Sequence, residues 1–128
     1  MSTNAMIARK VDAGYECIYN HWDGYIAHLG VTLRDAYNTD ELVASLIALG
    51  DCSSVSLTLD ECEFYHRDRN ANGNEKWENV KPCIYPTLIK AIAAYQNHYN
   101  YVWDDGEWKI YDRNAKPLSW DSDDEDED

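Results

Sequence analysis

The sequence has few positive charges for its number of negative ones, and this shortage argues against direct binding of nucleic acid. Eleven Lys and Arg residues stand against 24 Asp and Glu residues, which gives a formal net charge of −13. Direct binding of nucleic acid needs a basic face that neutralises phosphates, and an acidic chain has no surplus of bases for such a face. The composition therefore favours a partner that is itself basic, although it also suits plain solubility.

Long apolar runs, paired cysteines and nucleotide-binding patterns are also missing. No segment approaches the roughly 18 consecutive apolar residues of a membrane-spanning helix, and the four cysteines lack the C-x-x-C spacing typical of zinc sites. Neither G-x-x-x-x-G-K-[ST] nor G-x-G-x-x-G occurs, so a nucleotide-dependent enzyme is unsupported. We expect a cytoplasmic protein with reduced thiols, no cofactor and no membrane contact.

The chain is organised around the run His21-Trp22-Asp23-Gly24-Tyr25, which separates a strand pattern from helical patterns. Residues 15–20 alternate like a strand, and apolar residues recur at helical spacing over 25–37. Gly24 can adopt backbone angles that are closed to other residues, and Asp23 can accept from the free N–H groups of a helix. The run therefore predicts a corner at which a strand passes into a helix.

The rest of the pattern predicts strands at both ends of the chain with helices between them. Strands are expected over 6–11, 15–20 and 63–67, and helices over 25–37, 38–49 and 86–98. Asn38 and Glu41 have capping-box spacing at the start of the second helix. This order predicts one α+β domain over residues 1–120, with an antiparallel sheet of about four to five strands and two to three helices packed on one face.

The clearest hairpin covers residues 99–111. Its turn, Asp105-Gly106, is of the two-residue type that hairpins prefer. This turn sets a register in which Trp103 lies opposite Trp108, so that both rings share one face of the sheet.

A polar loop offers a candidate metal site. Asp68, Asn70 and Asn72, followed by Gly73, match the first half of a calcium-binding loop. The closing position does not match, because the twelfth residue is Asn79 rather than Glu. A polar loop exposed to solvent is the competing interpretation. We expect no bound metal and keep these three side chains as the candidates for one.

His21 and Asp23 could act as an acid–base pair, but the sequence supplies no nucleophile or oxyanion donor to complete a catalytic site. We favour hydrogen bonds from these side chains that fasten the corner, and we expect no catalytic residue. A site for a small molecule or metal near His21–Tyr25, and a hydrolase that uses His21 and Asp23, are the alternatives.

Seven of the acids lie in the last eight residues, and residues 121–128 are expected to form a disordered tail. Densely spaced carboxylates can occupy the basic groove of a nucleic-acid-binding protein, with the same electrostatics that attract DNA. A merely solubilising tail is the alternative. The candidate partner-binding residues are the tail acids and three acids at the hairpin tip: Asp121, Asp123, Asp124, Glu125, Asp126, Glu127, Asp128, Asp104, Asp105 and Glu107.

The corner and the segments after it resemble a family of small phage and prophage proteins. The matching runs are Tyr19–Tyr25, Leu29–Leu33, Tyr37–Thr39 and Leu46–Val55, against the family pattern HWDGYP, VGxxL, YN and LIALGDxSSL. Ile26 stands where the pattern has Pro, and Val55 where it has the final Leu. The resemblance covers about the first 55 residues and, loosely, the late hairpin. It carries over no activity and no catalytic residue, and it implies a phage or mobile-element context.

In that context we expect a non-enzymatic binding protein in the cytoplasm of a bacterial host. Small acidic phage proteins often bind a host protein, and some inhibitors of CRISPR or restriction systems imitate DNA. The expected function is inhibition of a host nucleic-acid-dependent defence complex through an acidic, DNA-mimicking surface. The expected partner is a basic host protein that binds nucleic acid, whereas the sequence specifies neither the target nor the oligomeric state.

Overall fold

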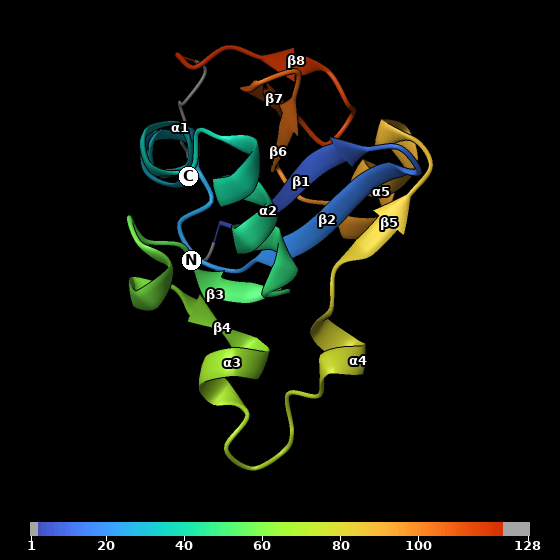
Figure 1. The fold of residues 1–128 in the computed structure, drawn as a ribbon. Coiled ribbons are helices and arrows are strands. Elements are labelled where there is room, and N and C mark those ends of the chain that lie inside the picture. Colours follow the sequence, from blue (N-terminus) through green and yellow to red (C-terminus); the bar gives the residue numbers. More distant parts are fainter. Residues whose placement is uncertain (1–2, 122–128) are drawn as a thin grey trace.

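The computed structural model describes residues 3–121 and is built on one mixed β-sheet (Figure 1). Its strands are β1 (Ala5–Val11), β2 (Gly14–Asn20), β3 (Cys52–Ser54), β4 (Glu63–Phe64), β5 (Cys83–Tyr85), β6 (Tyr99–Asp104), β7 (Glu107–Tyr111) and β8 (Pro117–Leu118). Their order across the sheet is β4-β3-β2-β1-β6-β7-β8, and β5 pairs with β2 outside this order. The β1–β6 and β2–β3 pairs are parallel, whereas the other pairs are antiparallel.

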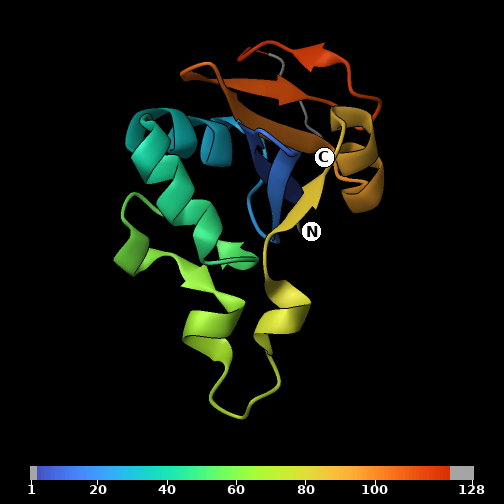
Figure 2. The same cartoon turned by 45° about the vertical axis from the view of Figure 1, so that its right-hand side comes forward.

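Helices lie on both faces of this sheet. They are a π-helical segment η1 (Ile26–Gly30), α1 (Val31–Ala36), α2 (Asp40–Ala48), a 3₁₀ segment η2 (Leu59–Glu61), α3 (Tyr65–Arg69), α4 (Trp77–Val80) and α5 (Leu88–Tyr95). Figure 2 shows α1 and α2 on one side of the central strands and α5 on the other. None of the helices in the described chain has the length and apolar character needed to cross a membrane.

The two faces bury two separate apolar cores. Successive strand residues point to opposite faces, so the adjacent residues Met6 and Ile7 of β1 enter different cores. The larger core joins the strands to η1, α1 and α2, and its fully buried side chains include Ile7, Ile18, Leu33, Leu46, Ile47 and Tyr101. The smaller core joins the other face to α5 and contains Met6, Ala8, Cys17, Ala91, Ile92 and Val102.

The predicted sheet and helix arrangement is wrong. The protein is α+β, but its sheet is mixed rather than antiparallel, it has eight strands in the described chain, and its helices cover two faces instead of one. Alternation of apolar and polar residues indicates a strand but not the direction of the strand beside it. The sequence therefore held no signal for the parallel β1–β6 pairing. Strands of two or three residues, such as β5 and β8, are too short to show a period.

The expected strand over 63–67 is also wrong beyond its first two residues. β4 ends at Phe64, and α3 starts at Tyr65. The Asp68 Oδ2 atom accepts the Phe64 N–H at 2.8 Å, which satisfies one of the donors left free at the start of the helix. A helix of five residues is below the length at which helical spacing becomes visible in a sequence.

Two helix ends differ from their predicted positions for identifiable reasons. At α2 the cap is Thr39, whose Oγ1 accepts from the Leu42 N–H at 3.1 Å, and not the predicted Asn38. α5 ends at Tyr95 rather than near His98, because Gln96 takes a left-handed φ of 55°.

The late hairpin is confirmed in its register. Trp103 lies opposite Trp108, and their ring centroids are 5.4 Å apart in an edge-on arrangement. Asp105 and Gly106 have φ values of 57° and 77°, as a type I′ turn requires. The expected strands over 6–11 and 15–20 leave three residues between them, whereas Gly14 belongs to β2 and pairs with Val11, so that a two-residue turn joins β1 to β2.

Candidate functional site

The predicted corner at His21–Tyr25 lies between β2 and η1, and Gly24 is its point of closest packing. The Gly24 N–H donates to the Thr3 carbonyl at 2.8 Å, and the Gly24 carbonyl accepts from the buried Tyr101 hydroxyl at 2.7 Å. A Cβ atom on Gly24 would lie 2.8 Å from the Thr3 oxygen and from the Ala5 Cβ. Glycine is therefore required at position 24 because a Cβ atom does not fit there, and not because of the unusual backbone angles that we predicted.

His21 and Asp23 face different partners. The His21 Nδ1 atom lies 2.7 Å from the Tyr19 hydroxyl, and the Asn4 amide donates to the His21 carbonyl at 2.8 Å. Asp23 adopts a φ of 55° and places its Oδ2 atom 4.0 Å from the His28 Nε2 atom. Within residues 3–121 no hydrogen bond or ion pair joins His21 to Asp23, and η1 has no side-chain cap. The His21 side chain thus fastens the corner through Tyr19.

Two aromatic side chains of the corner are exposed. Trp22 is 46% and Tyr25 is 37% exposed, although the Trp22 backbone is held to β3 by a 2.9 Å hydrogen bond to the Ser53 carbonyl. The Tyr25 ring contacts the His28 ring, which borders a shallow groove lined by His28, Thr32, Val55, Ser56, Leu57 and Glu61. Exposed Trp and Tyr side chains are typical of protein interfaces.

A second polar region lies at the tip of the β6–β7 hairpin. Asp105 and Glu107 are exposed there, and Asp104 pairs with Lys109 at 3.6 Å. The Trp103 Nε1–H group donates to the Asp40 Oδ1 atom at 2.6 Å, which brings the first turn of α2 beside the hairpin. We call this region the acidic end, and it consists of Asp40, Glu41, Asp104, Asp105 and Glu107. The sequence predicted the three hairpin acids but not the two on α2, because only a tertiary contact brings them there.

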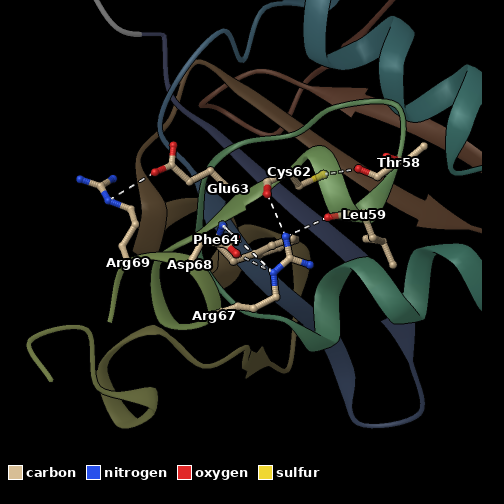
Figure 3. Close-up of polar contacts among 8 residues, drawn as sticks. All are labelled: Thr58, Leu59, Cys62, Glu63, Phe64, Arg67, Asp68 and Arg69. Carbon is tan, nitrogen blue, oxygen red and sulfur yellow. Dashed lines mark hydrogen bonds and ion pairs between the residues drawn. The ribbon is translucent and has the colours of Figure 1, made fainter. Parts of the chain in front are cut away.

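Asp68, the first candidate ligand of the polar loop, belongs to a network centred on Arg67 (Figure 3). The Arg67 Nε–H donates to Asp68 Oδ1 at 2.9 Å, and its Nη2 donates to the Leu59 and Cys62 carbonyls at 2.9 and 2.8 Å. The hydrogen bond from Arg67 lowers the pKa of Asp68. The network ties the segment before β4 to α3, so that Arg67 and Asp68 have structural partners.

The other two candidate ligands do not converge with Asp68. Asn70 uses its Oδ1 atom to accept the Glu75 N–H at 2.9 Å, and Asn72 is exposed. In the described part of the chain no group of three or more His, Cys, Asp or Glu side chains is placed to hold a metal ion. The tail candidates after Asp121, namely residues 122–128, lie outside the described residues and stay a prediction.

Asp51 is a polar junction that the sequence analysis missed. Its Oδ1 atom accepts from the Tyr19 N–H at 2.9 Å, its own N–H donates to the Val80 carbonyl at 2.8 Å, and its carbonyl accepts from the Tyr65 N–H at 3.2 Å. It therefore joins β2, α3 and the end of α4. Burial raises the pKa of Asp51 to about 6, against the lowering effect of the hydrogen bond from Tyr19. Its position directly after the helix-ending Gly50 was the available signal.

We expect Asp51→Asn to stabilise the protein at pH 7 by about 1 kcal/mol, a value reduced for the partial exposure of the carboxylate. The pKa rises from 3.8 in the unfolded chain to about 6 on folding. The folded state therefore binds this proton more tightly, so the contribution of Asp51 to stability is greatest below about pH 4 and declines as the pH rises through 6. Asn retains an oxygen that accepts from Tyr19 but carries no charge.

Urea unfolding of both proteins at pH 4 and pH 7 measures this effect. The gain should be large at pH 7 and small at pH 4, because the carboxyl group is then mostly neutral in the folded wild type. A loss of stability that is equal at both pH values would contradict the role of desolvation.

No protein-family model, curated protein or solved structure matches this chain. The resemblance to small phage and prophage proteins therefore stays a hypothesis, and the candidate regions are judged by their own geometry.

Proposed function

We propose that the protein is a phage-encoded, non-enzymatic binding protein that inhibits a host nucleic-acid-dependent defence complex of the CRISPR or restriction type. It would do so by presenting acidic surface to a basic, nucleic-acid-binding component of that complex. The observation that carries the proposal is the acidic end, where the hydrogen bond from Trp103 to Asp40 holds the acidic first turn of α2 against the hairpin that carries Asp104, Asp105 and Glu107.

Two contacts position the acidic end, and one of them, the Asp104–Lys109 ion pair, offsets a single negative charge. The Trp103 indole N–H donates to Asp40 Oδ1, and an indole brings no positive charge to the acidic end. Lys109 is the basic residue of the hairpin and pairs with Asp104, whereas Asp105 and Glu107 are exposed. Rigidly spaced carboxylates on a folded surface lose little conformational entropy on binding. Their attraction to a basic groove follows the electrostatics of a phosphate backbone.

The acidic tail adds a second source of negative charge in this proposal. The chain has seven acids after Trp120, and only Asp121 of them is described. A hydrolase that uses His21 and Asp23 is not proposed, since within residues 3–121 no contact joins the two side chains.

The test is capture of proteins from a bacterial host lysate at ~0.05 and ~0.3 M salt. The higher salt concentration shortens the distance over which exposed charges attract each other. The full chain is compared with a chain that ends at Trp120 and with the triple variant Glu41→Gln, Asp105→Asn and Glu107→Gln. These changes preserve side-chain size, and Asn suits the left-handed turn position of Asp105. A control variant, Asp60→Asn, Glu63→Gln and Glu78→Gln, removes the same charge elsewhere.

We expect the full chain to retain a nucleic-acid-binding protein that excess duplex DNA displaces and that higher salt releases. Neutralising the acidic end or removing the tail should weaken this capture about tenfold at low salt, and the control variant should not. Equal capture by the full chain, the shortened chain and the triple variant would overturn the proposed surface and leave the exposed Trp22 and Tyr25 of the corner as the next candidates. A captured protein that DNA does not displace would overturn mimicry.

A further inference from the structure

Two of the four cysteines lie directly opposite each other on neighbouring strands. β2 and β5 are antiparallel, and their register pairs Cys17 with Cys83. Directly opposed residues on antiparallel strands point to the same face, and their Cα atoms are about 4.5 or 5.5 Å apart, depending on the kind of pair. Both values lie within the roughly 4.4–6.8 Å range that a disulfide spans. The structure has both residues as free thiols.

The two thiols differ in their access to solvent. Cys17 is fully buried beneath α5, and its Sγ–H donates to the Tyr15 carbonyl at 3.4 Å. Cys83 is exposed on β5. Burial and, to a smaller extent, the neighbouring Cys83 thiol raise the pKa of Cys17 to about 12. Cys83 is therefore the thiol that a soluble oxidant reaches first, and Cys17 is the adjacent thiol that can resolve the product.

We propose that Cys17 and Cys83 are a redox-sensitive pair that forms a cross-strand disulfide when a low-molecular-weight disulfide, such as oxidised glutathione, is present. The Cys83 thiolate attacks one sulfur of glutathione disulfide and expels one glutathione thiolate, which leaves a mixed disulfide on Cys83. Cys17 then loses its proton, attacks the Cys83 sulfur and expels the second glutathione thiolate. The two protein thiols lose two protons and two electrons, and one glutathione disulfide is reduced to two glutathione molecules.

The other two cysteines are positioned differently. Cys52 and Cys62 belong to the larger core on the opposite face of the sheet. The Cys62 sulfur is surrounded by the Tyr37 hydroxyl at 3.3 Å and the Ser56 N–H at 3.2 Å. Both are buried, so a soluble disulfide has no direct access to either. The reaction should therefore be selective for one pair.

The bond would fasten β5, which is held to the sheet by only a three-residue pairing with β2. β5 is also the route by which the chain passes from α4 to α5, along the right-hand side of Figure 1. A bond between positions 17 and 83 closes a long loop, and loops of this size restrict the unfolded chain strongly. Oxidation would thus convert a weakly held edge strand into a covalently fixed one.

The test treats the folded full chain with oxidised glutathione, then unfolds it in denaturant, blocks the remaining thiols with iodoacetamide and maps the peptides by mass spectrometry. We expect one cross-linked peptide pair that contains Cys17 and Cys83, a mass lower by two hydrogens, and two thiols that remain alkylatable. The oxidised protein should melt about 5–15 °C higher, and dithiothreitol should reverse the shift.

Two exposed-site variants keep the proposal falsifiable without disturbing the core. Cys83→Ser should give neither the cross-link nor the shift in melting temperature. The double variant Cys83→Ser and Ile84→Cys moves the exposed thiol by one residue, so that it points to the other face of β5. It should accept glutathione but not cross-link to Cys17. Stable glutathionylation of wild-type Cys83 without loss of the Cys17 thiol, or a Cys83-linked dimer, would overturn the proposal.

Discussion

Gly14→Ala should lower the free energy of unfolding by more than about 3 kcal/mol, because the added Cβ has no space. That atom would lie 2.1 Å from the Tyr85 carbonyl oxygen and 2.8 Å from the Pro86 Cα atom. Both neighbours are backbone atoms of β5 and the residue after it, so no side-chain rotation relieves the contact. Gly14 also has a φ of 136°, which L side chains rarely adopt. β5 must therefore move away from β2.

Gly73→Ala is the matched control for the conformational part of this cost. Gly73 has a φ of 73°, and nothing lies within 4 Å of the Cβ position. Its replacement should cost only about 1 kcal/mol, from backbone strain alone. Urea unfolding followed by circular dichroism measures both variants. Equal losses for the two would show that the close approach of β5 to Gly14 is absent in solution.

Trp108→Ala should cost about 3–5 kcal/mol, which is a large share of the roughly 5–15 kcal/mol that stabilises a typical domain. The Trp108 side chain is only 6% exposed and packs edge-on against Trp103. Its Nε1–H donates to the Tyr37 carbonyl at 2.8 Å. Tyr37 lies between α1 and α2, so this indole fastens the helix junction that precedes the acidic end.

Trp108→Phe separates the two contributions of this side chain. Phenylalanine retains most of the ring volume but has no N–H group, which leaves the buried Tyr37 carbonyl without this donor. We expect a loss of about 1–2 kcal/mol for that change. Denaturant unfolding should rank wild type, Trp108→Phe and Trp108→Ala in that order. If both variants lost the same amount, the hydrogen bond rather than the packing would carry the energy.

Features set by neighbouring residues were predictable from the sequence. The Asp105-Gly106 turn fixes its hairpin because both residues tolerate a positive φ, and the register of Trp103 with Trp108 follows from the turn length. The change of structure at Gly30, where the π-helical η1 gives way to α1, also falls at a residue that weakens a helix.

Features set by distant residues were not predictable. The parallel β1–β6 pairing depends on segments at opposite ends of the chain, and no periodicity specifies direction. β5 is three residues long, yet it creates the Cys17–Cys83 juxtaposition. Asp40 and Asp51 owe their roles to partners more than 30 positions away, Trp103 and Tyr19. For Asp51 the sequence signal was its position directly after Gly50, and for Asp40 it was only that the chain is acidic.

The parallel pairing of β1 with β6 also has a kinetic consequence. Arg9 lies beside Trp103, 94 positions later, so closing this pair brings together residues separated by most of the chain. Folding rates fall as the sequence separation of contacting residues grows, and pairings this distant place folding in the slower range of small proteins. Until β6 pairs with it, β1 exposes an edge of unpaired backbone groups. Beside this edge lie side chains such as Ile7, which are fully buried in the folded protein. The newly made chain is therefore most prone to aggregation during the interval before its last third has folded.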